Sequence, residues 1–159
     1  MRFGVHYLNT YFPALDGSVP QVYRHLIAQV QEAEALGFTD VWVTEHHFHE
    51  FGGLIPTPPV FLTALAAATQ CIRLGVAISV LPLHHPLHNA EAYAMVDVLS
   101  GGRLELGVGR GSTPEEFSEG GLDYGDSALR LREHMEALLQ AWSDAPVCFQ
   151  GELYRFDHV

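Results

Sequence analysis

The sequence predicts an α/β fold in which short parallel strands alternate with helices. Four apolar segments typical of strands are separated by segments whose apolar residues recur at helical spacing. Each helical segment between two strands is long enough for a right-handed parallel connection. No Gly-x-Gly-x-x-Gly pattern follows the first strand, which argues against a dinucleotide-binding sheet. Four such βα units fit a doubly wound sheet or half of a (β/α)8 barrel, and the pattern alone does not choose between them. We expect the four strands to be parallel and to lie in the order of the sequence, as they do in half of a barrel.

The first half of the chain contains three of the predicted strands, at residues 3–8, 39–44 and 72–80. Between the first two, Ser18 is a candidate cap and Pro20 lies in the first turn of a helix that ends before Gly37. A second helix is expected over residues 57–68. The third strand is apolar at nearly every position, as expected of a parallel strand that is covered on both faces.

The second half of the chain adds the fourth strand and more helices. We expect a helix over residues 86–99, a strand over 103–108, a short helix after a glycine-rich turn, a helix over 126–143 and a β-hairpin over 147–159. The buried stripe of the long helix is predicted to consist of Leu131, Met135, Leu138, Leu139 and Trp142.

Composition limits the classes of function. A chain of 159 residues that is 48% hydrophobic is long and apolar enough for one domain with a core. The net charge is −11 and every positive residue is Arg, so we expect no nucleic-acid partner. No apolar run approaches the roughly 18 residues of a membrane span, and the N-terminus lacks a signal-peptide pattern. Two widely separated cysteines indicate free thiols and a cytoplasmic protein.

Chemistry-bearing residues follow the second predicted strand directly. The apolar run Val41–Val43 leads into Glu45, His46 and His47, and α/β proteins place their sites at the carboxyl ends of such strands. Because the two histidines are adjacent, we expect them to point to opposite sides. A metal-dependent hydrolase is an alternative, since five imidazoles occur at two strand ends: His46, His47, His49, His84 and His85. Glu45 stands too close to the pair in sequence to be expected as a separate ligand.

Five short motifs occur in order along the chain: Glu45-His46-His47-Phe48, Leu81-Pro82-Leu83-His84-His85-Pro86, Ala90-Glu91, Ser100-Gly101-Gly102-Arg103 and Gly107-Val108-Gly109-Arg110-Gly111. Together they resemble the bacterial luciferase-like flavin monooxygenases. The resemblance implies a (β/α)8 TIM-barrel fold, truncated here to about four βα units. It implies oxidation of a small organic substrate by O2, with reduced FMN supplied by a flavin reductase. The deazaflavin F420 of a sister branch is less expected.

The resemblance also implies roles for individual residues. His46 takes the position of the active-site acid or base, a role that suits an imidazole near neutral pH. His6, Glu45 and Ala77–Ile78 are implied as cofactor-binding residues, and the family often has a cis peptide bond at the last of these. Arg110 takes the position of the arginine that binds the flavin phosphate, and a guanidinium beside a helix start suits a phosphate.

Two departures from the family pattern qualify these expectations. Gly109 replaces the reactive cysteine of luciferase itself, which argues against light emission as the main activity. The chain has four of the family's eight units, so we expect residues 1–159 to be the N-terminal half of the barrel, with 147–159 as the start of a hairpin insertion. Such a half is expected to bind FMN weakly, to turn over poorly unless two chains associate, and to form a homo- or heterodimer. A non-catalytic half-barrel that binds flavin or a partner is the further alternative.

Overall fold

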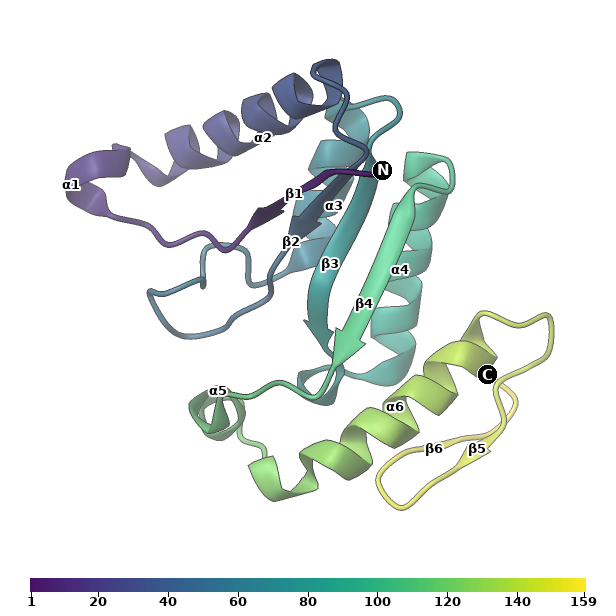
Figure 1. The fold of residues 1–159 in the computed structure, drawn as a ribbon. Helices are drawn as coiled ribbons and strands as arrows, with labels where there is room; N and C mark the ends of the chain where they lie inside the picture. The colour runs from purple at the N-terminus through teal and green to yellow at the C-terminus, as the bar shows by residue number, and fades with distance from the viewer. The chain divides into compact units, whose positions relative to one another are not determined.

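The computed structural model describes residues 1–159 (Figure 1). Its strands are β1 (Gly4–Tyr7), β2 (Asp40–Val43), β3 (Arg73–Val80), β4 (Leu104–Gly109), β5 (Phe149–Gln150) and β6 (Arg155–Phe156). Its helices are α1 (Pro13–Asp16), α2 (Val19–Ala35), α3 (Pro58–Ala68), α4 (Pro86–Ser100), α5 (Pro114–Glu119) and α6 (Ser127–Ala141), with the 3₁₀ turns η1 (Leu81–Leu83) and η2 (Tyr124–Asp126). The chain forms two compact units: Met1–Ser79 with Val96–Gly107, and Val80–Met95 with Val108–Val159.

The first unit contains most of a four-stranded parallel sheet with the order β1-β2-β3-β4 (Figure 1). In its register Val5 is paired with Val41, which is paired with Leu74. The sequential parallel order is therefore confirmed, and each strand begins and ends within one or two residues of its predicted bounds. Because all strands run the same way, the residues after β1 and β2 meet at one edge of the sheet.

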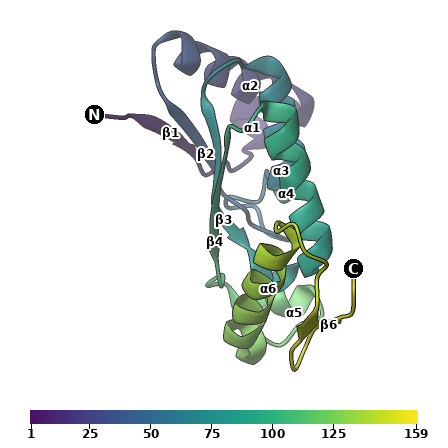
Figure 2. The same ribbon diagram turned by 90° about the vertical axis from the view of Figure 1, so that its right-hand side faces the viewer.

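One face of this sheet is covered by helices. Figure 2 shows α2 and α3 on the same side of the strands. The side chains of Val41, Val43, Leu74 and Val76 have no exposed surface, and they alternate along their strands as a covered face requires. Burying an aliphatic side chain of this size contributes roughly 1.5–3 kcal/mol, so this layer is the main stabilising element of the unit.

The opposite face carries larger and more polar groups. His6, Trp42 and Gly75 lie in register across the three neighbouring strands. The Trp42 ring lies directly over Gly75, where an added Cβ would be 2.3 Å from ring atom Cε3. Glycine at this position is therefore what allows the indole to lie flat on β3.

The loop that leads into β3 is bound by a carboxylate from α2. Glu34 accepts backbone N–H groups of Gln70 at 3.0 Å, Cys71 at 2.7 Å and Ile72 at 2.8 Å. Burial acts to raise the pKa of Glu34, but these hydrogen bonds favour the ionised form and the net shift is downward. This contact ties the helix layer to the start of the strand.

The second unit is built around α6 and the β5–β6 hairpin. The antiparallel hairpin is present as predicted. Its Val147 and Phe149 pack with Ala137 of α6 in a small apolar core. The carboxylate of Glu133, which is only 3% exposed, accepts the backbone N–H groups of residues 152, 153 and 154 at 2.8–3.1 Å. The hairpin turn is thus held on the helix by a buried charge.

The buried side of α6 differs from the predicted stripe. Leu138 is buried as expected, but Met135, Leu139 and Trp142 are 40%, 60% and 42% exposed. Glu133 and His134 are buried in their place. The reason is that Glu133 has three backbone donors as partners, which removes the cost that normally keeps a carboxylate at the surface. None of the helices combines the length and the hydropathy that a membrane span requires.

Candidate functional site

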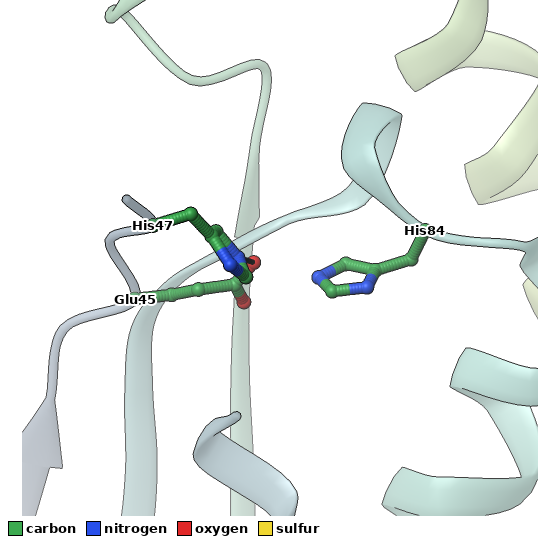
Figure 3. Close-up of side chains that lie close together, drawn as sticks. All are labelled: Glu45, His47 and His84. Carbon is green, nitrogen blue, oxygen red and sulfur yellow. Dashed lines mark hydrogen bonds and ion pairs between the residues drawn. The ribbon is translucent and has the colours of Figure 1, made fainter. Parts of the chain in front are cut away.

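The residues after β2 form two separate contacts within the first unit. Glu45 is almost completely buried, and its Oε1 lies 3.0 Å from Nε2 of His47. Figure 3 shows the two side chains side by side. Glu45 and His47 therefore lie together, and the expectation that Glu45 is not a separate metal ligand stays a prediction. Glu45 and His47 are two residues apart, and side chains at this spacing point to the same side of an extended chain.

His46 lies in a different environment from His47. Its ring faces Gly52, where an added Cβ would lie 2.7 Å from His46 Cδ2, and its centroid is 5.6 Å from that of His49. The backbone N–H of Gly52 donates to Thr10 Oγ1 at 3.0 Å, which holds this loop near the end of β1. Gly52 and His49 thus contact His46, whereas Glu45 contacts His47; that the two rings point to opposite sides stays a prediction.

His6 and Thr44 join the carboxyl ends of two neighbouring strands. His6 Nε2 lies 2.7 Å from Thr44 Oγ1, and the His6 side chain is exposed. His6 is on the sheet face that α2 and α3 leave uncovered, in register with Trp42. The threonine hydroxyl can donate to or accept from the ring, so the pair can hold either tautomer of a neutral imidazole.

Ala77 and Ile78 lie in the second half of β3 and are both partly buried. The peptide bond between them is cis, as the family resemblance led us to expect at this position. Along β3, Gly75 and Ala77 lie on the uncovered face; the Trp42 ring covers Gly75, and Ala77 follows it with a small side chain.

Arg110 lies in the second unit, and its side chain is exposed. Its Nη2 donates to the hydroxyl of Tyr124 at 2.9 Å, and its guanidinium carbon is 5.2 Å from the centre of the same ring. Both contacts are with a neutral group, so they orient the guanidinium without neutralising its charge. The predicted helix after the glycine-rich turn is α5, but with six residues it contributes little to a helix dipole.

A second histidine environment in this unit was not predicted. His134 of α6 is completely buried beside η1, and Asn89 Nδ2 lies 3.4 Å from its Nε2. Burial, together with the neighbouring His84 and His85, lowers the pKa of His134 from 6.5 to about 4. The sequence did contain a signal for the burial of His134. It precedes Ala137 by three residues and Leu138 by four, so the three share one face of the helix.

A family model for luciferase-like monooxygenases matches residues 1–159. The chain belongs to the luciferase-like monooxygenase family. It is 31% identical over 159 residues to the alkanal monooxygenase alpha chain of the Kryptophanaron alfredi symbiont, covering all of this chain and 44% of that relative. It is 33% identical over 138 residues to the oxygenase component of the flavin-dependent trigonelline monooxygenase of Acinetobacter baylyi, covering 86% of this chain and 38% of that relative.

The crystal structure of monooxygenase RslO1 from Streptomyces bottropensis has the same fold as this chain. The TM-score is 0.93 with 36% sequence identity, over 98% of this chain and 47% of RslO1. The chain therefore spans less than half the length of the family members it matches. The predicted (β/α)8-type architecture, present here as four βα units, is confirmed, and family membership favours a monooxygenase over the metal-dependent hydrolase that the histidine pattern also allowed.

Proposed function

We propose that the protein acts as a flavin-dependent monooxygenase that oxidises a small organic substrate with O2, using FMN reduced by a separate flavin reductase. The observation that carries the proposal is the group His6, Thr44 and His46 at the carboxyl ends of β1 and β2, in a chain that the family model matches throughout. The relatives support it, because one of them is the oxygenase component of a flavin-dependent monooxygenase, and an oxygenase component implies another component.

The uncovered face of the sheet in the first unit suits a flat aromatic cofactor. Ala77 gives the second half of β3 a small side chain on this face, and His6 offers an imidazole on the same face of β1, across β2 from β3. We propose that Ala77 and Ile78 contact the flavin ring and that His6 contributes a hydrogen bond. A bound reduced flavin would supply the electrons that activate O2. FMN is the cofactor proposed and F420 the less favoured one, on the strength of the Glu45-His46-His47-Phe48 motif.

Among these residues, His46 is assigned the role of acid or base. An imidazole can take up and release a proton near neutral pH, which is what a general acid or base must do. Glu45 is proposed to act on the cofactor site through His47, because its Oε1 is 3.0 Å from that ring. A buried carboxylate beside His47 favours a ring that carries a proton on Nε2.

In the second unit, we propose that Arg110 binds the flavin phosphate. Tyr124 orients the guanidinium through a hydrogen bond and its ring, and a planar guanidinium can bind two phosphate oxygens.

The β5–β6 hairpin is proposed to be the start of an insertion in the barrel. Strands β1 and β4 are the edges of the sheet, and unpaired parallel edges favour pairing with further strands, so we propose a dimer. A cytoplasmic location, in which the free Cys71 and Cys148 stay reduced, is likewise a proposal.

Turnover of His46→Ala, made in a full-length relative of this chain, tests the chemical role. We expect the rate with photoreduced FMN, O2 and a panel of small aldehydes, ketones and aromatic acids to fall by about 100- to 10,000-fold, the usual range for loss of a general acid or base. His25→Ala is the matched control, because His25 is an exposed histidine of α2. If His46→Ala kept the full rate while His47→Ala lost it, the acid–base role would belong to His47. FMN binding without any oxidation of substrate would favour a non-catalytic flavin-binding protein.

A further inference from the structure

The β5–β6 hairpin of the second unit brings a thiol, an imidazole and a carboxylate together. Cys148 Sγ lies 3.5 Å from His158 Nδ1, and Asp157 Oδ1 lies 2.9 Å from the same nitrogen. The three ligand atoms are all within 4.8 Å of one another. The side chains are exposed, and none of them belongs to the proposed flavin chemistry.

A β-bulge explains why three side chains meet here. Two cross-strand pairs flank the position: Phe149 with Phe156, and Val147 with Val159. Between them, Cys148 on one strand faces both Asp157 and His158 on the other, which is the two-against-one count of a bulge. In a regular pair, successive side chains would point to opposite faces. The bulge re-aims them, with His158 at φ 51°, and both reach Cys148.

The hairpin that carries the cluster is anchored on both sides. Val147 and Val159 exchange backbone hydrogen bonds of 2.8 and 3.2 Å, which close the hairpin next to the cluster. At the turn, the buried Glu133 carboxylate binds three consecutive N–H groups. The ligand atoms are therefore preorganised by the backbone, which lowers the entropy cost of binding an ion.

We propose that Cys148, Asp157 and His158 form a binding site for a divalent metal ion of the zinc class. With Zn–S at about 2.3 Å and Zn–N at about 2.0 Å, a tetrahedral ion separates sulfur from nitrogen by about 3.5 Å. Cys148 Sγ and His158 Nδ1 already have this separation. Asp157 Oδ1 is the third ligand, and solvent occupies the fourth position. Metal binding displaces the thiol proton to solvent and leaves the ring proton of His158 on Nε2.

The same geometry argues against a cysteine nucleophile. A nucleophile–His–acid arrangement needs the nucleophile and the acid on opposite ring nitrogens, so that one nitrogen accepts a proton while the other is held by the acid. Here the sulfur and the carboxylate both approach Nδ1 of His158. Three donors that converge on one point suit a cation placed between them.

Titration of the 159-residue chain with Co²⁺ and Zn²⁺ tests the site. We expect one equivalent of Co²⁺ to give a thiolate-to-metal charge-transfer absorption that Zn²⁺ displaces. Cys148→Ser should remove this absorption, and His158→Gln should weaken binding by about 10-fold or more, because each removes one of three ligands. Cys71→Ser is the matched control, since Cys71 is an exposed thiol of the first unit and should leave the signal unchanged.

The absorption band distinguishes this site from imidazole-only binding elsewhere in a histidine-rich chain. Circular dichroism of each variant shows that it is folded, which is expected because all three side chains are exposed. The proposal is overturned if the wild-type chain gives no thiolate band with Co²⁺, if the band persists in Cys148→Ser, or if Cys71→Ser removes it. The test does not depend on flavin binding or turnover.

Discussion

Acidification should destabilise the second unit through His134. In the fold this side chain is completely buried and its pKa is about 4, against 6.5 for an exposed imidazole. Between these two values the unfolded chain binds a proton that the folded chain does not, so the free energy of unfolding decreases as the pH falls. The contribution is fully present above about pH 7.

The size of the effect follows from the pKa difference. A shift from 6.5 to about 4 corresponds to about 3 kcal/mol, at about 1.4 kcal/mol per pKa unit. About 2 kcal/mol of this should be lost between pH 7 and pH 5, and the remainder by pH 4. A loss of this size is a large fraction of the roughly 5–15 kcal/mol of a typical domain.

Urea unfolding at pH 7, 6 and 5 measures the effect. Trp142, whose indole N–H donates to the carbonyl of Ala90 at 3.0 Å, reports on the second unit when Trp42 of the first unit is replaced by Phe. In this background, His134→Gln should reduce the pH dependence by about 2 kcal/mol between pH 7 and pH 5. His25→Gln, at an exposed histidine, is the control and should leave it unchanged.

A single comparison would refute the reasoning. If His134→Gln unfolded with the same pH dependence as the parent chain, the buried imidazole would not be the group that titrates, and other histidines of the unit would have to be responsible. His85 is the next candidate, because burial and the neighbouring His88 also lower the pKa of His85.

Two further measurements address the hairpin and the association of chains. Glu133→Gln should lower the stability of the second unit by about 2 kcal/mol, because hydrogen bonds to a charged acceptor are worth about 1.5–3 kcal/mol each and the amide keeps part of them. The control is Glu136→Gln at an exposed position, which should change the stability by less than about 0.5 kcal/mol. Equal effects of the two substitutions would contradict the role given to Glu133. Sedimentation of the 159-residue chain beside an FMN titration should show association and weak FMN binding, whereas a monomer with micromolar or tighter affinity would contradict both proposals.

The architecture could be read from the sequence because it depends on local patterns. Alternation of apolar strand segments with helical periodicity, and turn residues such as Ser18 and Gly37, are decided by neighbours in the chain. The parallel strands and the hairpin followed from these patterns and are confirmed, whereas the order β1-β2-β3-β4 followed from the half-barrel expectation and is also confirmed. The short α1 was missed, since a four-residue helix has no periodicity to detect.

The contacts between side chains could not be predicted in the same way. Which residues meet depends on strand register, on irregular segments and on a single extra residue in a hairpin. The sequence placed His46 and His47 after a strand, but only the structure paired Glu45 with His47 and His46 with His49. These residues lie in a loop, where the alternation of a strand no longer dictates direction.

Burial of polar groups was also decided by tertiary structure. Periodicity assigned the inner side of α6 to apolar residues, yet Glu133 and His134 are buried while Met135 and Leu139 are exposed. Backbone N–H groups from a segment some twenty residues further along the chain bind the Glu133 carboxylate and remove the cost of burying it. No local pattern encodes such a partner, because it exists only once the hairpin has folded onto the helix.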